Sequence, residues 1–263
     1  MKVSVITVVY NNTETIVSAI ESVLGQNYPY REYIVIDGGS TDGTLSKIRS
    51  YGDKIDLVIS EPDKGIFDAM NKGLHKATGD VIAFLNSDDF YADKQVIERV
   101  VSALQDDTVD AVFGDLHYVY ANNTSSIFRV WKSGDYKPGS FLYGWMPPHP
   151  AFFAKRTVYE RYGKFNTAFK IAADYELLLR LMHINKINVS YLPEVLVKMR
   201  TGGISNAGLR NRLLANFEDR KAWDINGVRP YFFTLFLKPV RKSFQFIIAF
   251  FRKITVESKS ISH

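Results

Sequence analysis

The 263-residue sequence has no cysteine and no apolar run that approaches the length of a bilayer-spanning helix, about 18 residues. The first absence excludes disulfides and thiolate metal sites and fits a reducing compartment. The second excludes a membrane-spanning helix. The short apolar run at 3–9 is too brief for a signal peptide and predicts a first strand. The glycine-rich motifs that bind phosphates or dinucleotides are also missing.

Positive charge is scarce outside the C-terminal fifth of the chain. The net charge is +5, but residues 209–263 hold 11 Lys and Arg against 4 Asp and Glu. The remaining residues, with 22 against 24, offer no basic face, so we expect no nucleic-acid partner. We predict two parts, a main domain at 1–208 and a basic C-terminal extension at 209–263.

Short apolar strands alternate with helical segments along the first hundred residues. Strands are expected at 3–9, 33–36, 57–59 and 81–85, and helices at 12–25, 44–51, 64–77 and 94–105. This order predicts an α/β fold with a Rossmann-like, mostly parallel sheet flanked by helices. Later segments predict an antiparallel excursion at 116–129, a loop at 136–150, helices at 156–162, 173–184 and 209–224, and a strand at 189–197 interrupted at Pro193.

Polar, glycine-rich or acidic residues follow each of the first four predicted strands. The segments are 10–12, 37–44, 61–65 and 86–89. Ligands of open parallel sheets bind beyond the carboxyl ends of the strands, so four such segments at one edge predict a binding crevice. A single segment of this kind would be only a turn.

The residue types in this crevice suit a nucleotide diphosphate. Asp88 and Asp89, in the stretch FLNSDDF, suit Mg²⁺ or Mn²⁺ shared with a substrate phosphate. Lys64, near a helix start, adds positive charge for the same phosphates. Asp37 can accept an N–H of the base, and Tyr10 offers a flat ring on which the base can stack.

Six stretches, in this order, resemble the family 2 inverting glycosyltransferases, which have the GT-A fold. The stretches are ITVVYNN, IVIDGGSTDGT, SEPDKGIFDAMNKGLHKATGD, FLNSDD, AADYELLLRL and RTGGISN. The resemblance is greatest to transferases that build bacterial O-antigen, capsule or exopolysaccharide repeat units. It implies transfer of a hexose from a UDP-sugar to a lipid-diphosphate-linked sugar, with Mn²⁺ or Mg²⁺ as cofactor.

The resemblance implies a role for each residue at the nucleotide end of the crevice. Tyr10 matches the residue that stacks on uracil, and Asp37 matches the one that accepts its N3–H. Asp88 matches the second acid of the metal-binding D-x-D motif and is expected to be the main metal ligand. Asn86 stands at the first acid, where it keeps an acceptor oxygen and loses a charge. Asp89 is expected to position the donor or acceptor sugar.

The resemblance also implies a general base. Asp174, in AADYELLLRL, matches the acid of an E-D pair whose glutamate is replaced here by Ala173. It is expected to take the proton from the attacking acceptor hydroxyl. The cation at Asp88 would stabilise the leaving diphosphate, so no acid is needed there. Arg200, in RTGG, is expected in a loop that closes over the diphosphate.

Each assignment has an alternative that needs no ligand. Asp88 or Asp89 can cap the following helix, and Asp174 can be an acid at a helix N-terminus. Asp37 can be an ordinary turn residue, and Lys64 can be a solvated surface charge.

Two other functions also stay open. One is a nucleotidyltransferase that forms sugar nucleotides, although VVYNNTET lacks the glycine-rich basic loop expected of it. The other is a non-catalytic relative that binds nucleotide or membrane, although the presence of both Asp88 and Asp174 is unfavourable to it.

The extension has the composition of a membrane-surface segment. Residues 229–253 contain six Lys and Arg, no acid and eight aromatic residues. On a helix, Phe244, Ile247, Ile248 and Phe251 share one face, and the basic residues lie around the other. We expect a cytoplasmic protein that is peripheral on the inner face of the plasma membrane, close to a lipid-linked acceptor. The alternative is a tail helix packed on the body or an oligomer contact.

Overall fold

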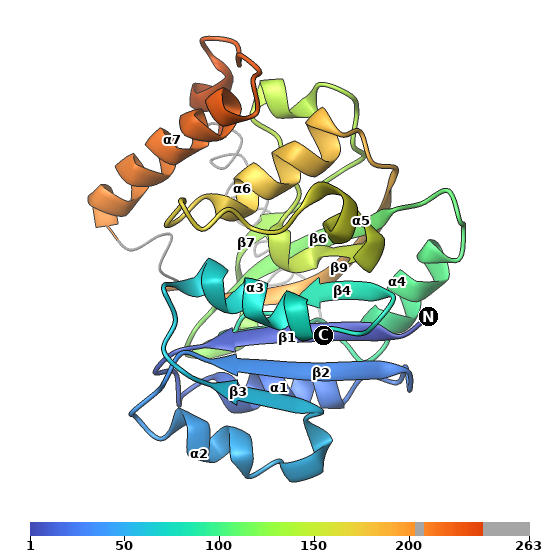
Figure 1. Cartoon of the computed structure of the whole chain (residues 1–263), viewed down its shortest axis with the longest axis vertical. Helices are drawn as coiled ribbons and strands as arrows, with labels where there is room; N and C mark the ends of the chain where they lie inside the picture. Colours follow the sequence, from blue (N-terminus) through green and yellow to red (C-terminus); the bar gives the residue numbers. More distant parts are fainter. Residues whose placement is uncertain (203–207, 239–263) are drawn as a thin grey trace, which may run out of the picture.

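The computed structural model describes residues 1–202 and 208–238 and shows a curled sheet with helices on both faces (Figure 1). In this part of the chain the strand order is β3-β2-β1-β4-β8-β6-β9-β5, and β7 pairs with β6. The predicted α/β class and the mostly parallel, Rossmann-like sheet flanked by helices are confirmed.

The N-terminal half of the sheet is parallel and buried on both sides. It consists of β1 (Val3–Val9), β2 (Arg31–Asp37), β3 (Leu57–Ser60) and β4 (Val81–Phe84). One core lies between this sheet and three helices, α1 (Ile16–Leu24), α2 (Thr44–Arg49) and α4 (Val96–Leu104). The other core includes α3 (Ile66–Lys76). Coverage on both faces explains why these strands are apolar at most positions on both faces instead of alternating.

The second half of the sheet is mixed. It contains β5 (Asp89–Tyr91), β6 (Ala111–Tyr120), β7 (Asn123–Trp131), β8 (Phe152–Lys155) and β9 (Val189–Arg200). β6 and β7 form the expected antiparallel hairpin, and β8 joins β4 to β6. β5 pairs with the far end of β9, with Asp89 opposite Met199. This pairing brings residues separated by more than a hundred positions to the crevice.

The strand that was expected to be interrupted at Pro193 shifts its register against β6 between Phe113 and Asp115, and it continues to Arg200. Proline has no N–H to donate, and a bulge accommodates it without breaking the ladder. In the first turns of α3, Ile66 is 40% exposed, whereas Phe67 and Met70 are buried.

The remaining helices cover one face of the sheet. α5 (Arg156–Tyr162) is followed by α6 (Ala173–Leu178), which continues as wider, π-type turns over Leu179–Ile184. α7 (Gly208–Ile225) packs on α6, where the fully buried Trp223 donates its indole N–H to the Tyr175 hydroxyl over 2.9 Å. None of the helices within 1–202 and 208–238 is both long enough and apolar enough to cross a membrane.

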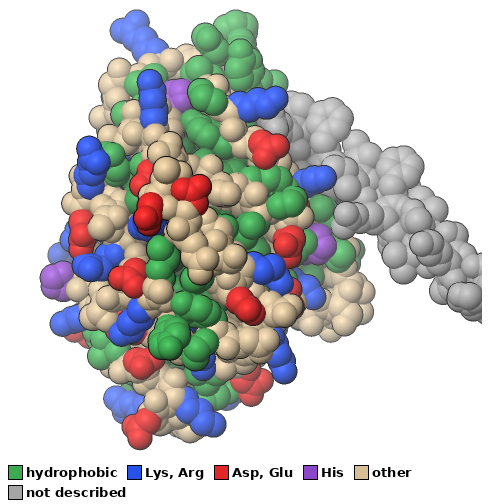
Figure 2. All heavy atoms as spheres, turned by 90° about the vertical axis from the view of Figure 1, so that its right-hand side faces the viewer, with side chains coloured by type: hydrophobic (Ala, Val, Ile, Leu, Met, Phe, Trp, Pro, Cys, Tyr) green, Lys and Arg blue, Asp and Glu red, His purple; other side chains and the backbone are tan. Residues whose placement is uncertain are grey.

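The predicted amphipathic helix around Phe244 to Phe251 lies outside the described residues. The chain just before it, at 231–238, carries exposed aromatic side chains, with Phe232 88% and Phe236 72% exposed. On the face drawn in Figure 2, acidic and basic side chains are interspersed over the body, and hydrophobic side chains gather at the top. The division into parts at residue 208 stays a prediction.

Candidate active site

The loops after the parallel strands meet at one edge of the sheet. Asp37, the last residue of β2, pairs with Val9 on one side and with Ser60 on the other. The chain leaving β4 stays beside β1, because the Leu85 N–H donates to the Ile6 carbonyl over 3.0 Å. All four predicted strand-end segments therefore lie along the same edge, as expected.

The segments after β1, β2 and β3 form one corner of the crevice. Tyr10 is 65% exposed and presents its ring there. A Cβ on Gly38 would lie 3.0 Å from Asp63 Oδ2 and 3.4 Å from the Tyr10 ring, so any larger residue here would crowd both groups. Asp37 is buried and accepts the Ser60 hydroxyl over 2.6 Å and the Ser40 N–H over 3.2 Å. It thus has the turn role considered above, and base recognition by Asp37 stays a prediction.

No role was assigned from the sequence to two residues of this corner, Asp63 and Lys72. Asp63 forms an ion pair with Lys72 over 2.5 Å, and Lys72 also contacts Glu61 over 2.8 Å. Lys64, the cation chosen from the sequence, is exposed just before α3, and its backbone N–H donates to Asp68 over 3.0 Å. Helical spacing from Asp68 to Lys72 is the signal that could have found Lys72.

Residues 86–89 form an acidic turn after β4, and hydrogen bonds hold this turn to the loop that follows β1. The Asn12 side chain donates to the Ser87 hydroxyl over 2.9 Å, and the Thr15 hydroxyl donates to the Ser87 carbonyl over 2.8 Å. Within the turn, Asn86 Nδ2 donates to Asp89 Oδ2 over 3.0 Å. Asp89 is buried, and Asp88 is half-buried. Asn12 and Thr15 thus join the nucleotide corner to the predicted metal ligands.

The turn carries carboxylates in a place that disfavours their charge. Burial raises the pKa of Asp88, and burial together with the neighbouring Asp88 charge raises the pKa of Asp89 well above its ordinary value. Neither acid caps the next helix, because Gln95 is the N-cap of α4 and the nearest acid, Asp93, accepts the Gln95 N–H. The capping alternative is therefore wrong.

The residues of the turn fit a divalent cation shared with a ligand. Two buried oxygens, Asn86 Oδ1 and Asp89 Oδ1, have no hydrogen-bond partner in the described part of the chain. Buried unpartnered oxygens beside an ionisable carboxylate are what a hard cation requires. No cluster of three or more His, Cys, Asp or Glu within 1–202 and 208–238 could hold a metal alone. Additional ligands would have to come from phosphate or water.

Arg200 lies behind the acidic turn. Its Nη1 donates to the Asp88 carbonyl over 2.8 Å, its Nη2 donates to the Ser18 hydroxyl over 2.9 Å, and its guanidinium stacks over the Phe90 ring at 4.7 Å. These contacts make Arg200 a support of the Asp88 backbone. Its predicted contact with a diphosphate is a separate role and stays a prediction.

Asp174 lies in the first turn of α6. Its Oδ1 accepts the Tyr175 N–H over 2.8 Å. Burial raises the pKa of Asp174, the positive charge of Lys238 opposes this shift, and the negative charge of Glu218 adds to it. A raised pKa suits a group that must accept a proton near neutral pH. A helix-terminal acid is also compatible with this position.

The pKa of Tyr118, in β6, is affected by the charges of both Asp89 and Asp174. Burial raises the pKa of the Tyr118 phenol, the Arg129 guanidinium lowers it, and the charges of both Asp89 and Asp174 raise it further. The Arg129 guanidinium stacks 3.7 Å from the centre of the Tyr118 ring. The charges of Asp89, in β5, and Asp174, in α6, therefore both act on the pKa of one side chain, and their joint membership of one catalytic site stays a prediction.

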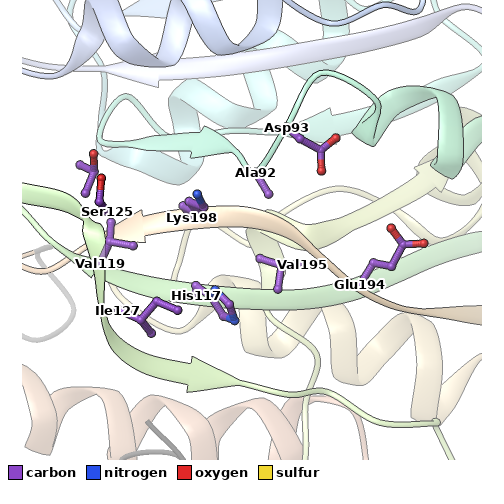
Figure 3. A pocket seen from close by; sticks show the side chains of 10 residues that line it. Ala92, Asp93, His117, Val119, Ser125, Ile127, Glu194, Val195 and Lys198 are labelled. Carbon is purple, nitrogen blue, oxygen red and sulfur yellow. The ribbon is translucent and has the colours of Figure 1, made fainter. Parts of the chain in front are cut away.

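A separate hollow of about 410 Å³ lies against β5, β6, β7 and β9 (Figure 3). Asp93, His117, Glu194 and Lys198 are among its lining residues. It contains none of the predicted site residues.

Comparisons with known proteins agree with this architecture. The sequence profile described as Glycosyl transferase family 2 matches residues 4–163. An uncharacterised glycosyltransferase of Mycobacterium tuberculosis is 33% identical over 180 residues, which are 68% of this chain and 68% of the relative. A PGL/p-HBAD biosynthesis glycosyltransferase of the same species is 27% identical over 209 residues, 77% of this chain and 78% of the relative.

Two solved structures share the fold. S. aureus TarS 1-349, in complex with UDP-GlcNAc, has a TM-score of 0.65 and 19% identity, over 86% of this chain and 65% of that one. The present chain therefore spans slightly less than two thirds of that TarS fragment. The mannosyltransferase PcManGT from Pyrobaculum calidifontis, in complex with GDP-Man and Mn²⁺, has a TM-score of 0.64 and 21% identity, over 90% and 68%.

The fold and the crevice define a GT-A glycosyltransferase. The chain belongs to glycosyl transferase family 2, as the profile match over residues 4–163 and the relative at 33% identity show.

Proposed function

We propose that the protein transfers a hexose, with inversion, from a UDP-sugar to a lipid-diphosphate-linked sugar during bacterial surface polysaccharide synthesis, of the O-antigen, capsule or exopolysaccharide kind. The observation that carries the proposal is the acidic turn. Asn86 and Asp89 hold buried oxygens without partners, and Asn12 and Thr15 fasten this turn to the loop that presents Tyr10. A nucleotide in the corner would thus hold its diphosphate at the turn.

The nucleotide corner supplies stacking and acceptors. The exposed Tyr10 ring takes the base, and the carboxylates of Asp37 and Asp63 accept its N–H groups or ribose hydroxyls. Lys64 is exposed just before α3, where its ammonium group would face the phosphates. The presence of UDP-GlcNAc in the TarS complex supports a UDP donor, whereas GDP-Man in the PcManGT complex makes a GDP donor the main competitor.

Asp88, Asn86 and Asp89 would hold Mn²⁺ or Mg²⁺ against the diphosphate. The Mn²⁺ in the PcManGT complex supports this assignment. Such a cation, when bound, stabilises the negative charge of the departing nucleotide diphosphate. Arg200 keeps the Asp88 backbone in place, and its cationic head adds to the attraction for phosphate.

Asp174 acts as the base. The acceptor hydroxyl is a poor nucleophile, and it must lose its proton to a carboxylate as it attacks the anomeric carbon. A single displacement of this kind inverts the configuration at that carbon. The raised pKa of Asp174, caused mainly by burial, suits the role.

The basic, aromatic extension brings the crevice to the inner face of the plasma membrane. The exposed Phe232 and Phe236 side chains and the six Lys and Arg of 229–253 support contact with anionic lipid. A lipid-linked acceptor would lie at that surface.

The test is to measure nucleotide release from UDP- and GDP-sugars, with Mn²⁺, in the presence and absence of a lipid-diphosphate-linked sugar. We expect acceptor-dependent UDP release and a glycosylated lipid. A nucleotidyltransferase would release pyrophosphate from a nucleoside triphosphate and a sugar phosphate instead. A non-catalytic binder would release nothing, and a preference for GDP-sugars would overturn the UDP assignment alone.

A further inference from the structure

A glutamate from the C-terminal helix holds the turn that leads to Asp174. Glu218 of α7 is 5% exposed, and its carboxylate accepts three consecutive backbone N–H groups. The donors are Lys170 and Ile171, both at 2.8 Å, and Ala172 at 2.9 Å. These residues come directly before α6. Within 1–202 and 208–238, these three amides are therefore satisfied by a residue more than forty positions away.

Lys238, which follows α7, contacts residues on the other side of Asp174. Lys238 Nζ donates to Asp219 Oδ2 over 2.6 Å and lies 3.9 Å from the centre of the Tyr175 ring. The Asp219 side chain is only 3% exposed, so Lys238 is the counter-ion of a buried carboxylate. Tyr175 follows Asp174 directly and is also held by Trp223. Residues 218–238 thus contact the backbone just before Asp174 and the Tyr175 side chain just after it.

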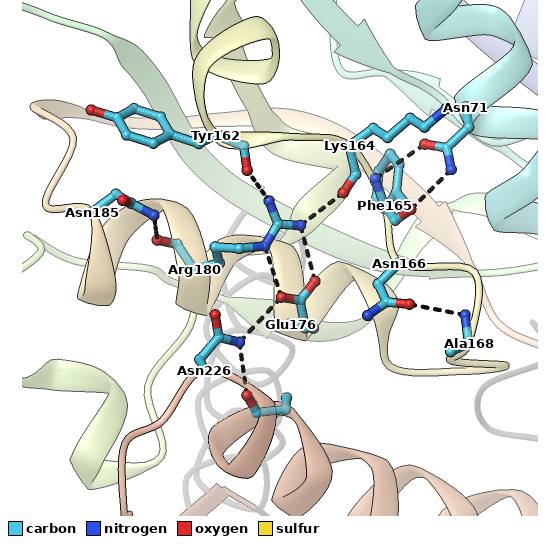
Figure 4. A network of polar contacts seen from close by, with 11 residues as sticks. Asn71, Tyr162, Lys164, Phe165, Asn166, Ala168, Glu176, Arg180, Asn185 and Asn226 are labelled. Carbon is cyan, nitrogen blue, oxygen red and sulfur yellow. Dashed lines mark hydrogen bonds and ion pairs between the residues drawn. The ribbon is translucent and has the colours of Figure 1, made fainter.

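α7 and α6 are further joined by the polar network of Figure 4. Asn226 donates to Glu176 Oε1 over 3.1 Å, and Glu176 forms an ion pair with Arg180 over 2.8 Å. Arg180 also donates to the carbonyl groups of Tyr162 and Lys164. The orientation of α6 is therefore fixed independently of Glu218, which makes a change at Glu218 local to the turn.

Acidic groups outnumber basic groups around Asp174. Three carboxyl groups, Asp174, Glu218 and Asp219, face one ammonium group, Lys238. The charge of Asp174 in turn raises the pKa of Tyr118 and of Asp219. Burial raises the pKa of Asp174 most, Lys238 lowers it and Glu218 raises it.

We propose that Glu218 and Lys238 are positioning residues for the base, so that the segment 208–238 is part of the transfer machinery as well as the approach to the membrane. Glu218 fixes the backbone that aims Asp174, and Lys238 balances the negative charge around it. The inference rests on the proposed function in one respect, the role of Asp174.

The test compares Glu218→Gln and Lys238→Met with Arg220→Met, which removes an exposed charge from the same helix. Glutamine keeps the shape of Glu218 but has one acceptor oxygen for three N–H groups. Methionine keeps the packing of Lys238 on Tyr175 without the charge. We expect kcat to fall by roughly 10- to 100-fold in Glu218→Gln, the scale of a slight misplacement of a reacting group. KM for the donor should stay unchanged, and Arg220→Met should match the parent protein.

The pH profile separates positioning from mere support of the fold. Asp174 works when ionised, so the acidic limb of kcat follows its pKa. Lys238→Met removes a lowering influence and should move that limb to higher pH. Glu218→Gln removes a raising influence and should move the limb to lower pH. Shifts of opposite sign in two neighbouring variants do not arise from general loosening of the fold.

The outcomes are distinguishable. Unchanged kcat and pH limbs in both variants, with turnover lost in Asp174→Asn, would overturn this inference and leave the base assignment intact. A lowered melting temperature with an unmoved pH limb would also overturn it, because the residues would then be structural only. Full turnover in Asp174→Asn would remove the base assignment and this inference together.

Discussion

Arg200 donates one hydrogen bond from Nη1 to the backbone carbonyl of Asp88, over 2.8 Å, and a second from Nη2 to Ser18, over 2.9 Å. One guanidinium therefore joins the end of β9, the acidic turn and α1. The two bonds leave from different nitrogens, which an ammonium group cannot reproduce.

Replacing Arg200 by Lys should therefore weaken UDP binding in Mn²⁺ about as much as replacing it by Met. Hydrogen bonds to charged groups contribute about 1.5–3 kcal/mol, so a loss of about tenfold or more is expected. Titration calorimetry measures it. Near-normal binding by Arg200→Lys, with loss only in Arg200→Met, would instead indicate that charge toward the diphosphate is what matters.

Asp174→Asn should lower turnover by roughly 10²–10⁴-fold, the usual contribution of a general base. Asparagine keeps the shape and removes the proton acceptor, and the base faces the acceptor, so the donor dissociation constant should change little. Single-turnover kinetics and UDP-sugar titration check the two halves. A variant that keeps more than about a third of its turnover would move the base elsewhere, with Asp89 the next candidate.

Asp89→Asn should raise the melting temperature in EDTA at neutral pH. Burial raises the pKa of Asp89 in the folded protein, so its contribution to stability is present at low pH and is lost as the pH rises through that pKa. The difference from the parent should therefore vanish in acid and grow toward neutral pH. Mn²⁺ should stabilise the parent more than the variant.

Thermal melts from acid to neutral pH, with and without Mn²⁺, measure this difference. Asp107→Asn is the control, because Asp107 is exposed. Equal melting temperatures for the parent and Asp89→Asn across the pH range, without metal, would contradict the claim that burial destabilises the charged form of Asp89.

A chain that ends after Lys238 should lose membrane binding but keep transfer to a short soluble acceptor. The ion pair between Lys238 and Asp219 stays in this truncation, whereas ending at Gly227 would remove it. The deleted residues include Arg241, Lys242, Arg252 and Lys253. Basic residues near an anionic surface contribute about 1 kcal/mol each.

Sedimentation with phosphatidylglycerol vesicles measures the loss, and neutral phosphatidylcholine vesicles are the control. Unchanged partition of the truncated chain onto the anionic vesicles would refute docking through the tail. Lost transfer to the soluble acceptor would show that the tail beyond Lys238 also serves catalysis.

Much of the parallel half could be predicted because its signals are local. Val3–Val9 is mostly apolar and is buried at every position, and the residues after each strand must meet at one edge once the strands are parallel. This placed Tyr10, Asp37 and Asp88 along one crevice without any knowledge of distances.

The rest depends on contacts that no local pattern shows. Glu218 reaches the amides of Lys170 to Ala172 only because α7 packs on α6, and Asp63 and Tyr10 both come close to Gly38 through the folding of separate loops. The sequence indicates an interruption at Pro193, whereas the continuation of β9 past this residue depends on its pairing with β6.

The central claim is that the acidic turn binds the nucleotide diphosphate through a divalent cation. The most direct measurement is the UDP dissociation constant of the parent protein and of Asp88→Asn, each in Mn²⁺ and in EDTA. The account predicts tight binding only for the parent in Mn²⁺, with Asp88→Asn in Mn²⁺ as weak as the parent in EDTA. Equal UDP affinity in Mn²⁺ and EDTA, or full affinity in Asp88→Asn, would contradict it.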